Sequence, residues 1–364
     1  MPRKRTRPEN RGLPARWRQR HGAYFYDVPT HLRHLWDGKR EYRLGASLPE
    51  AYRVWATRLE LHSDVRNIGQ LLERYALEVV PTKAPRTQAG NTRAITRLKA
   101  VFGEMRIRDF KPIHAYQYRD RRKKHIEADS KIVTVSAPTA ANRELEVLSH
   151  AFTKAVEWGY RDDHPMIEGK FRKLPTLPRT RYVEDWEIVE ALSLTPRRKR
   201  GSLHAVRAYI KIKLLTGLRR GDLLRLRTTD LKDDGIHVQP HKTANTTGKK
   251  LIIEWTDALK QAVEEVKAAR PVDIGPLLFC TKGGDCYVKD DGTASSWDSM
   301  WQRFMDRVLS ETKVKERFTE HDLRAKCASD AKSLEHAQQL LTHASSETTK
   351  RIYRRKPERV KPLH

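Results

Sequence analysis

The sequence has few of the features that mark secreted or membrane proteins. It contains only three cysteines, Cys280, Cys286 and Cys327, and none of them belongs to a C-x-x-C pair. This spacing predicts neither a disulfide framework nor a zinc site, and it favours reduced thiols in the cytosol. No apolar run approaches the roughly 18 residues of a membrane-spanning helix, and the N-terminus is charged where a signal peptide would be apolar. We therefore expect a protein that is neither secreted nor inserted in a membrane.

Negative charge is also scarce. The chain of 364 residues has 46 Asp and Glu against 73 Lys and Arg, which gives a formal net charge of +27. Hydrophobic residues make up 38% of it, enough to build cores in two or three domains. The positive charge predicts a polyanionic partner, because each neutralised phosphate releases counterions and adds affinity. Ribosomal and chromatin proteins share this excess, but the long, well-patterned C-terminal half distinguishes this chain from them.

The N-terminal region begins with a basic block. Eight of the first twenty residues are Arg or Lys and one, Glu9, is acidic, a composition typical of a disordered arm. Short strands are expected at residues 23–28 and 41–45, followed by a helix that Ser47 caps and that ends near residue 61. The tyrosines of these strands are equally consistent with the core of a small sheet. Three basic residues flanking the strands are candidate phosphate contacts: Arg16, Arg18 and Arg20.

A helical pattern follows, from residue 67 to residue 164. Apolar residues recur at helical spacing in four segments, residues 68–76, 93–102, 112–124 and 140–158, with loops at residues 81–88 and 130–138. Six basic residues on this unit are further candidate phosphate contacts: Lys99, Arg119, Arg121, Arg122, Lys123 and Lys124. A merely solvated basic face is an equal alternative for each of them, since helices carry such charges for solubility. Residues 165–178 are proline-punctuated and aperiodic, which predicts a linker.

The C-terminal half contains a glycine that separates two helices. A helix is expected over residues 205–215 and stops at Thr216 and Gly217, because glycine permits a sharp change of direction. A second helix begins near Arg219 and Arg220, so that an arginine there can project into a groove. The fork of a guanidinium suits two phosphate oxygens in a way that lysine cannot match.

A hairpin and three polar motifs follow. Alternating residues predict strands at 235–239 and 251–255 around a turn at 241–249, a third strand at 277–280 and an amphipathic helix at 296–309. His321 and Arg324 stand three residues apart, so a helix places both on one face, where they can address one phosphate. A helix over residues 333–341 ends at Thr342 and His343, and Tyr353 comes ten residues after His343.

This ordered set of motifs resembles the tyrosine recombinases, specifically the phage-type (lambda-like) integrases, over most of the chain. The resemblance rests on T-G-x-R ending at Arg219, a K-T pair at Lys242, H-x-L-R from His321 to Arg324, then His343 and Tyr353. It implies a multidomain, mainly α fold with small β-sheets (α+β). The implied domains are a basic arm-type DNA-binding domain of a small sheet plus a helix (1–66), a helical SAM-like core-binding domain (67–164), a linker (165–178) and a mixed α/β catalytic domain (179–364).

The resemblance also assigns roles to the motif residues. Tyr353 would be the nucleophile that forms a 3′-phosphotyrosyl link and frees a 5′-hydroxyl, without cofactor or metal. Arg219, Arg324 and His343 would donate hydrogen bonds to the phosphate, and His321 would act as general base or electrostatic support.

The remaining roles fall on residues near the first arginine and in the hairpin. Lys242 would be the general acid, with Lys249 and Lys250 as alternatives if the turn is threaded differently. Arg220 occupies a variable slot and is a further candidate DNA contact, and Asp222 stands where the family usually has a carboxylate that orients Arg219.

Two positions depart from the family's usual pattern. Thr342 stands where the family commonly has glycine, in Leu-Gly-His. A side chain at this position affects how closely the backbone can approach its neighbours. Tyr353 follows His343 by ten residues where many members have nine, an offset that a turn or a helical shift can absorb.

The resemblance further implies partners and a location. They are double-stranded DNA at core and arm-type attachment sites, and a homotetramer on synapsed DNA in which the segment after the nucleophile packs on a neighbouring protomer. A host DNA-bending protein and an excisionase are additional candidates. The expected function is that of a prophage or mobile-element integrase in the bacterial host cytoplasm, associated with the nucleoid.

Three other functions share part of this pattern. A type IB topoisomerase uses phosphotyrosine chemistry but has no need of the N-terminal module. A chromosome-dimer-resolving recombinase typically begins directly at the helical core-binding domain. A non-catalytic DNA-binding protein would keep the charge and lose the chemistry, yet all six catalytic positions are filled here.

Overall fold

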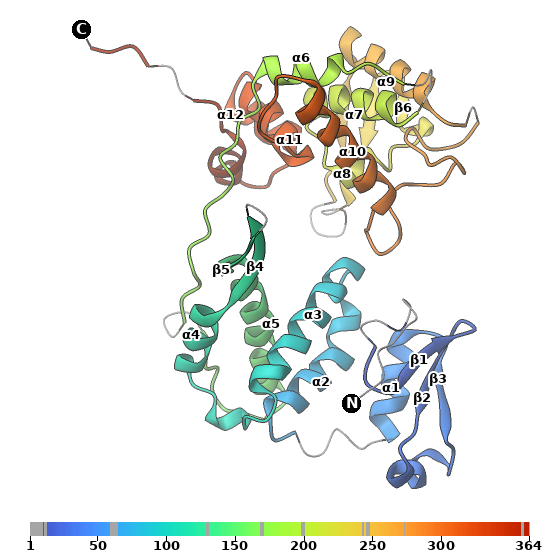
Figure 1. Ribbon diagram of the computed structural model, residues 1–364, viewed down its shortest axis with the longest axis vertical. Coiled ribbons are helices and arrows are strands. Elements are labelled where there is room, and N and C mark those ends of the chain that lie inside the picture. Colours follow the sequence, from blue (N-terminus) through green and yellow to red (C-terminus); the bar gives the residue numbers. More distant parts are fainter. Residues whose placement is uncertain are drawn as a thin grey trace. The chain divides into compact units, whose positions relative to one another are not determined.

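The computed structural model describes residues 10, 13–58, 65–128, 131–167, 171–197, 201–241, 244, 248–272, 274–357 and 360–363, without the side chains of residues 31, 34, 35, 56, 124–128 and 131–133. The chain divides into two compact units, Met1–Leu177 and Pro178–His364 (Figure 1). None of the described helices is long and apolar enough to cross a membrane.

The first unit begins with a three-stranded antiparallel sheet whose strands pair in the order β1-β2-β3. Its strands are β1 (Trp17–Arg20), β2 (Ala23–Asp27) and β3 (Glu41–Gly45), with a 3-10 helix at Thr30–Trp36 between the last two and α1 (Leu48–Arg58) after them. Tyr26 is buried in the small core, and Tyr24 and Tyr42 pack against it. The predicted disordered arm is wrong from Trp17 onward, because the buried Trp17 ring draws Arg18 and Arg20 into the sheet.

Four helices build the rest of the first unit around one hydrophobic core. They are α2 (Ile68–Glu78), α3 (Pro85–Phe102), α4 (Pro112–Arg121) and α5 (Pro138–Glu157), with 3-10 turns at Val80–Thr82 and Ile107–Asp109. Helix α3 starts within the predicted loop at residues 81–88, because a proline is well suited to the first helical position and Pro85 occupies it.

A hairpin replaces the expected end of α4 and the loop after it. Strand β4 (Lys123–Ala128) pairs antiparallel with β5 (Lys131–Ser136). The predictions of a helix to residue 124 and a loop at 130–138 are therefore wrong. The β-branched run from Ile132 to Val135 favours an extended strand.

The second unit packs helices around the buried α7 (Ser202–Thr216), which contacts α9 (Asp257–Ala269), α10 (Ser295–Glu311) and α11 (Glu320–Asp330) (Figure 1). The other helices are α6 (Asp185–Ser193), α8 (Arg220–Leu223), α12 (Leu334–Leu341) and α13 (Ser346–Thr348), with a 3-10 turn at Thr228–Asp230. Helices α6 and α9 have no counterpart among the elements expected from the sequence.

A small antiparallel sheet of order β6-β7-β8 completes this unit. Its strands are β6 (Leu231–Lys232), β7 (Gly235–Val238) and β8 (Leu251–Glu254). The strand predicted at residues 277–280 is wrong, since Leu277 makes a single isolated bridge to Arg227. Leu278 and Phe279 are buried there by hydrophobic contact instead.

Candidate active site

The site is built on the turn that ends α7. Gly217 has φ 62°, a left-handed conformation, and its N–H donates to the carbonyl of Lys213. A Cβ on Gly217 would lie 2.9 Å from Cδ2 of Leu341 and 3.1 Å from Sγ of Cys327. Glycine is therefore required both for the turn and for the close approach of α7 to α11 and α12. Its carbonyl accepts a hydrogen bond from Nη1 of Arg324.

Arg324 is fixed at the centre of the site. Only 2% of the residue is exposed, Nη2 donates to the carbonyl of Leu341 at 2.7 Å, and the same nitrogen lies 3.3 Å from Nε2 of His343. Burial and the neighbouring Arg219 lower the pKa of the guanidinium to about 10. Arg324 therefore stays cationic at neutral pH, in an orientation set by backbone carbonyls.

Tyr353 lies against this guanidinium and between two imidazoles. Its ring centroid is 4.7 Å from that of His343, 5.1 Å from that of His321 and 5.5 Å from Cζ of Arg324. Three side chains from α11 and the turn after α12 thus surround one phenol.

The backbone that carries Tyr353 is wound as a π-helical turn, Thr349–Tyr353, directly after α13. The N–H of Arg354 donates to the carbonyl of Thr349 at 3.1 Å, five residues back. Such a turn takes up one more residue than an α-turn. The ten-residue spacing between His343 and Tyr353 is accommodated by this winding.

Thr349 also orients His343. It is fully buried, and its hydroxyl lies 2.9 Å from Nδ1 of His343. With Nδ1 occupied, Nε2 faces Arg324. Thr349 is not among the residues expected from the sequence, where a threonine before a tyrosine carries no signal of such a contact.

His321 is the more exposed imidazole, in the first turn of α11. Although solvent reaches part of the ring, burial among protein atoms lowers its pKa to about 4, with further lowering by Arg355, Arg324 and Lys213. The ring is therefore neutral at neutral pH and able to accept a proton.

Arg219 enters the site from the other side of the glycine turn. It is half-buried, and its Nη1 donates to the hydroxyl of Thr342 at 3.4 Å. Thr342 itself has φ 51° and ψ 42°, so it adopts the left-handed conformation that glycine adopts at least cost.

The hairpin lysine cannot be placed in the same way, since Lys242 lies outside the described residues. The N–H of His241, one residue earlier, donates to Oδ1 of the buried Asp222 at 2.9 Å. Asp222 thus holds the end of the hairpin, and its N–H donates to the carbonyl of Arg219 at 3.0 Å. Lys249 and Lys250 are exposed just before β8.

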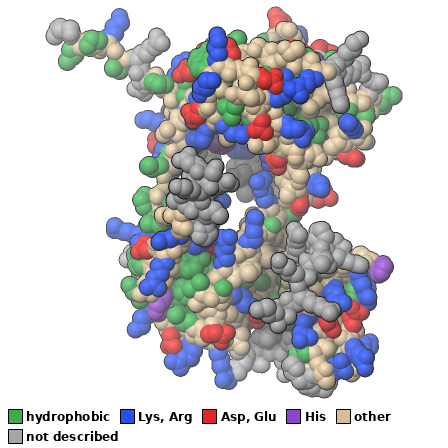
Figure 2. Space-filling view, viewed as in Figure 1, with side chains coloured by type: hydrophobic (Ala, Val, Ile, Leu, Met, Phe, Trp, Pro, Cys, Tyr) green, Lys and Arg blue, Asp and Glu red, His purple; other side chains and the backbone are tan. Residues whose placement is uncertain are grey.

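Five of the ten candidate DNA contacts are exposed: Arg16, Arg18, Arg20, Arg121 and Lys123. Arg18 forms an ion pair with Asp27 at 3.2 Å and Arg20 forms one with Glu41. Ion pairs at the surface, like those of Arg18 and Arg20, contribute little to stability, so both arginines can exchange their acidic partner for a phosphate. Other basic side chains are spread over both units on the face shown in Figure 2.

The other candidates are engaged by acidic neighbours or lie outside the described side chains. Lys99 pairs with Glu73, Arg119 with Asp120, Arg122 with Glu144, and Arg220 with Asp298. The side chain of Lys124 is not described. The Arg122 pair is the least accessible, because Glu144 is buried and also accepts from Tyr118 at 2.7 Å. Among the described residues, no group of three or more His, Cys, Asp or Glu side chains gathers as metal ligands would.

The chain matches one protein family and several solved structures. The model of the phage integrase family matches residues 187–359. A comparison with curated protein sequences gives no match.

Solved structures match most of the chain. A lambda integrase dimer bound to a COC′ core site has a TM-score of 0.59 and 19% identity, covering 96% of this chain and 99% of the other. A lambda integrase tetramer bound to a Holliday junction gives the same TM-score and identity over 97% and 99%. The Tn1549 transposon integrase with circular intermediate DNA has a TM-score of 0.57 and 17% identity over 78% and 94%. At these low identities the TM-scores show a shared fold alone, which is multidomain and mainly helical with small antiparallel sheets. Residues 187–359, which contain the whole cluster around Tyr353, form a domain of the phage integrase family, the tyrosine recombinases.

Proposed function

We propose that this protein is a site-specific DNA recombinase, a prophage or mobile-element integrase that cleaves and rejoins strands through a 3′-phosphotyrosyl intermediate. The observation that carries the proposal is the packing of Arg324, His343 and His321 around the ring of Tyr353. A phenol used only as core would not need a buried cation and two imidazoles beside it.

In the proposed reaction, Tyr353 Oη attacks the scissile phosphorus, and the 5′-oxygen of the next nucleotide leaves. The energy of the broken phosphodiester is kept in the phosphotyrosyl bond, so rejoining requires no nucleotide triphosphate. His321, neutral because its pKa is near 4, takes the phenolic proton. Lys242 protonates the departing 5′-oxygen.

Charge that develops on the non-bridging oxygens is met by Arg219, Arg324 and His343. Arg324 is already held by the carbonyls of Gly217 and Leu341, so it need not reorganise during the reaction. Removal of one such preorganised donor generally costs about 100- to 1,000-fold in rate. In this scheme side-chain cations supply what a metal ion supplies elsewhere, and we propose that the reaction requires neither metal nor cofactor.

The test is covalent trapping on nicked suicide duplexes that cover candidate attachment sites. The expected product is an SDS-resistant adduct of protein and DNA, formed in the presence of a metal chelator. Binding without any adduct on every duplex would favour a non-catalytic DNA-binding protein. Relaxation of supercoiled DNA without recombinant products would favour a type IB topoisomerase.

The domain roles are also proposals. We infer that residues 1–66 bind arm-type sites, that residues 67–164 bind core sites, and that residues 165–178 link them to the catalytic domain at 179–364. A homotetramer would assemble on paired sites in the bacterial cytoplasm, assisted by a host DNA-bending protein and an excisionase.

A chain that begins at Ile68 is expected to cleave a core-site duplex normally and to lose integration that depends on distant arm sites. Full integration by this truncated chain would instead fit a chromosome-dimer-resolving recombinase, which needs no arm domain.

A further inference from the structure

A buried carboxylate lies inside the His-x-x-Arg sequence. Asp322 is 0% exposed, and it follows His321 in the first turn of α11. The N–H and hydroxyl of Thr319 donate to its Oδ2 at 2.9 and 2.8 Å, as in a capping box. A short polar residue that only capped the helix would need no other partner.

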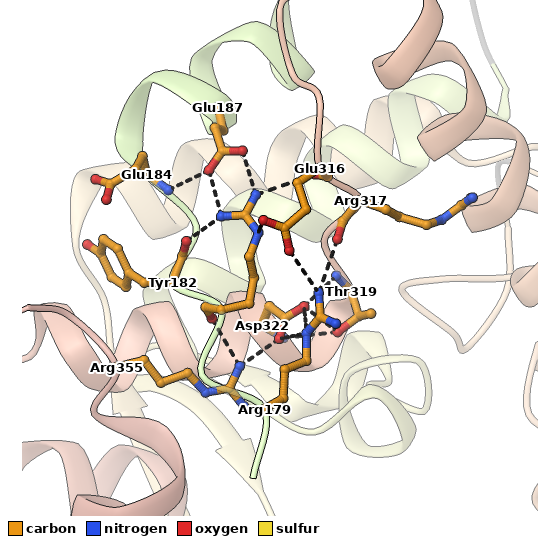
Figure 3. A network of polar contacts seen from close by, with 10 residues as sticks. Arg179, Tyr182, Glu184, Glu187, Glu316, Arg317, Thr319, Asp322 and Arg355 are labelled. Carbon is orange, nitrogen blue, oxygen red and sulfur yellow. Dashed lines mark hydrogen bonds and ion pairs between the residues drawn. The ribbon is translucent and has the colours of Figure 1, made fainter. Parts of the chain in front are cut away.

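Two arginines from distant segments also donate to this carboxylate. Nε of Arg179, from the segment that enters the second unit, lies 2.9 Å from Oδ1 and 3.0 Å from Oδ2. Nη1 of Arg355 lies 2.6 Å from Oδ1. Figure 3 shows the two guanidiniums pointing toward Asp322 from separate parts of the chain. Burial raises the pKa of Asp322, but the bonds from Thr319, Arg355 and Arg179 outweigh it and hold the pKa below its usual range. Asp322 is therefore charged at neutral pH.

Arg355 is the less accessible of the two, with 5% of its side chain exposed against 45% for Arg179. It stands two residues after Tyr353. Besides Asp322, its side chain donates to the carbonyl of Ile352 at 2.9 Å and to that of Arg181 at 3.1 Å. The carbonyls fix the plane of the guanidinium, so the ion pair with Asp322 has one geometry.

The backbone beside the nucleophile is tied to the same helix. The hydroxyl of Ser329, on α11, donates to the carbonyl of Tyr353 at 3.0 Å and accepts from the N–H of Arg355 at 2.8 Å. Asp322 and Ser329 thus hold the end of the π-turn at two points, seven residues apart on α11. Since His321 and Arg324 flank Asp322, these contacts set the distance between the nucleophile and the groups that act with it.

We propose that Arg355 is a positioning residue for Tyr353, which it holds in register with His321 and Arg324 through its ion pair with Asp322. The proposal rests on the recombinase function proposed above. Arg355 does not touch the reacting atoms, and its removal is expected to slow cleavage without weakening the binding of DNA.

The test compares Arg355→Gln, Arg355→Lys and a matched control, Arg354→Gln. The control removes the same charge one residue earlier, at an exposed side chain that forms no ion pair with any other residue in the described part of the chain and acts on Glu335 only at longer range. The single-turnover rate of adduct formation is measured on a nicked duplex at saturating DNA, together with the Kd for DNA and the thermal midpoint. Arg355→Gln is expected to slow the reaction about 10- to 100-fold, as loss of a residue that orients a reacting group does. Its Kd should stay within about twofold, Arg355→Lys should recover part of the rate because it keeps the charge, and the control should match the wild type.

A second measurement does not depend on cleavage. Hydrogen exchange of the backbone amides of residues 349–356 should accelerate in Arg355→Gln and not in Arg354→Gln, because the end of the π-turn is released. A wild-type cleavage rate or unchanged exchange in Arg355→Gln would overturn the proposal. The proposal would also be overturned if the Gln and Lys variants lost the same amount of rate and their thermal midpoints fell in proportion. Such a result would indicate that Arg355 only stabilises the fold. If the wild type forms no adduct, the recombinase function fails while hydrogen exchange still decides whether Arg355 holds the turn.

Discussion

The hydroxyl of Thr342 accepts a hydrogen bond from Nη1 of Arg219 across a sequence separation of 123 residues. The same hydroxyl donates to the carbonyl of Leu341 at 2.7 Å. Thr342 occupies a left-handed backbone position that favours glycine. The threonine therefore adds a polar contact to the first arginine of the site at the expense of local backbone strain.

We predict that Thr342→Gly is more stable than Thr342→Ala by about 1 kcal/mol, because glycine relieves the strain that alanine retains. Both variants lose the hydroxyl, so the comparison isolates the backbone effect. Urea unfolding of the two proteins measures the difference. Equal midpoints would show that the left-handed conformation costs nothing at this position.

We predict that Tyr353→Phe abolishes the covalent adduct and leaves the affinity for DNA within a few-fold, since affinity rests on many phosphate contacts. Tyr287→Phe is the control, because Tyr287 packs on Trp297 in the core of the same unit. Gel analysis after SDS treatment detects the adduct. A normal adduct in the Tyr353 variant would move the nucleophile to another side chain.

The lowered pKa of His321 predicts how the stability of the folded protein depends on pH. The unfolded chain binds a proton at this histidine below about pH 6.5, whereas the folded protein does so only near pH 4. Stability therefore falls as the pH decreases from about 6.5 to 4, and His321→Asn should lose this part of the pH dependence. The groups that face the ring, Arg355, Arg324, Lys213 and Asp322, are unchanged in that variant. An NMR titration of the free protein checks the value directly, and a His321 midpoint near 6.5 would contradict it.

The segment after Pro357 carries two exposed aliphatic side chains, Val360 (82% exposed) and Leu363 (94%). We predict that they contact a neighbouring protomer on paired DNA sites, with the free protein largely monomeric, because two aliphatic side chains bury little area. Deletion of residues 358–364, or Val360→Ser with Leu363→Ser, should spare binding to one site and reduce synapsis. Sedimentation that finds a stable tetramer without DNA, or unaltered recombination by the deletion, would argue against this role.

Helices with a long apolar stripe were predictable from the sequence. Helix α10 matches the expected segment because Trp297 and Phe304 recur at helical spacing and are buried. Residues 277–280 look like a strand in the sequence, because a short buried apolar run has the same pattern whether or not it pairs with another strand. The β4–β5 hairpin is not evident from the sequence, because the breakers between Ser130 and Pro138 indicate a loop and the residues before them continue a helical pattern.

The residues of the candidate site were also only partly predictable from the sequence. Arg219, His321, Arg324, His343 and Tyr353 could be named from motifs, and the structure brings them together. The residues that hold them could not be named. Thr349, Asp322 and Arg355 act through contacts set by the packing of α11 against the π-turn, and Thr319-x-x-Asp322 alone indicates only a helix cap.

The winding of the chain at Thr349–Tyr353 bears on how relatives of this protein are recognised. A pattern that places the tyrosine nine positions after the second histidine passes over this sequence, in which the offset is ten, although the two rings lie 4.7 Å apart. The spatial pairing of the rings is kept, and the number of residues between them is free to change where a wider turn absorbs the surplus. The number of residues in this segment is therefore a poor criterion for homology. An alignment should place a gap there, and the gap does not indicate an inactive site.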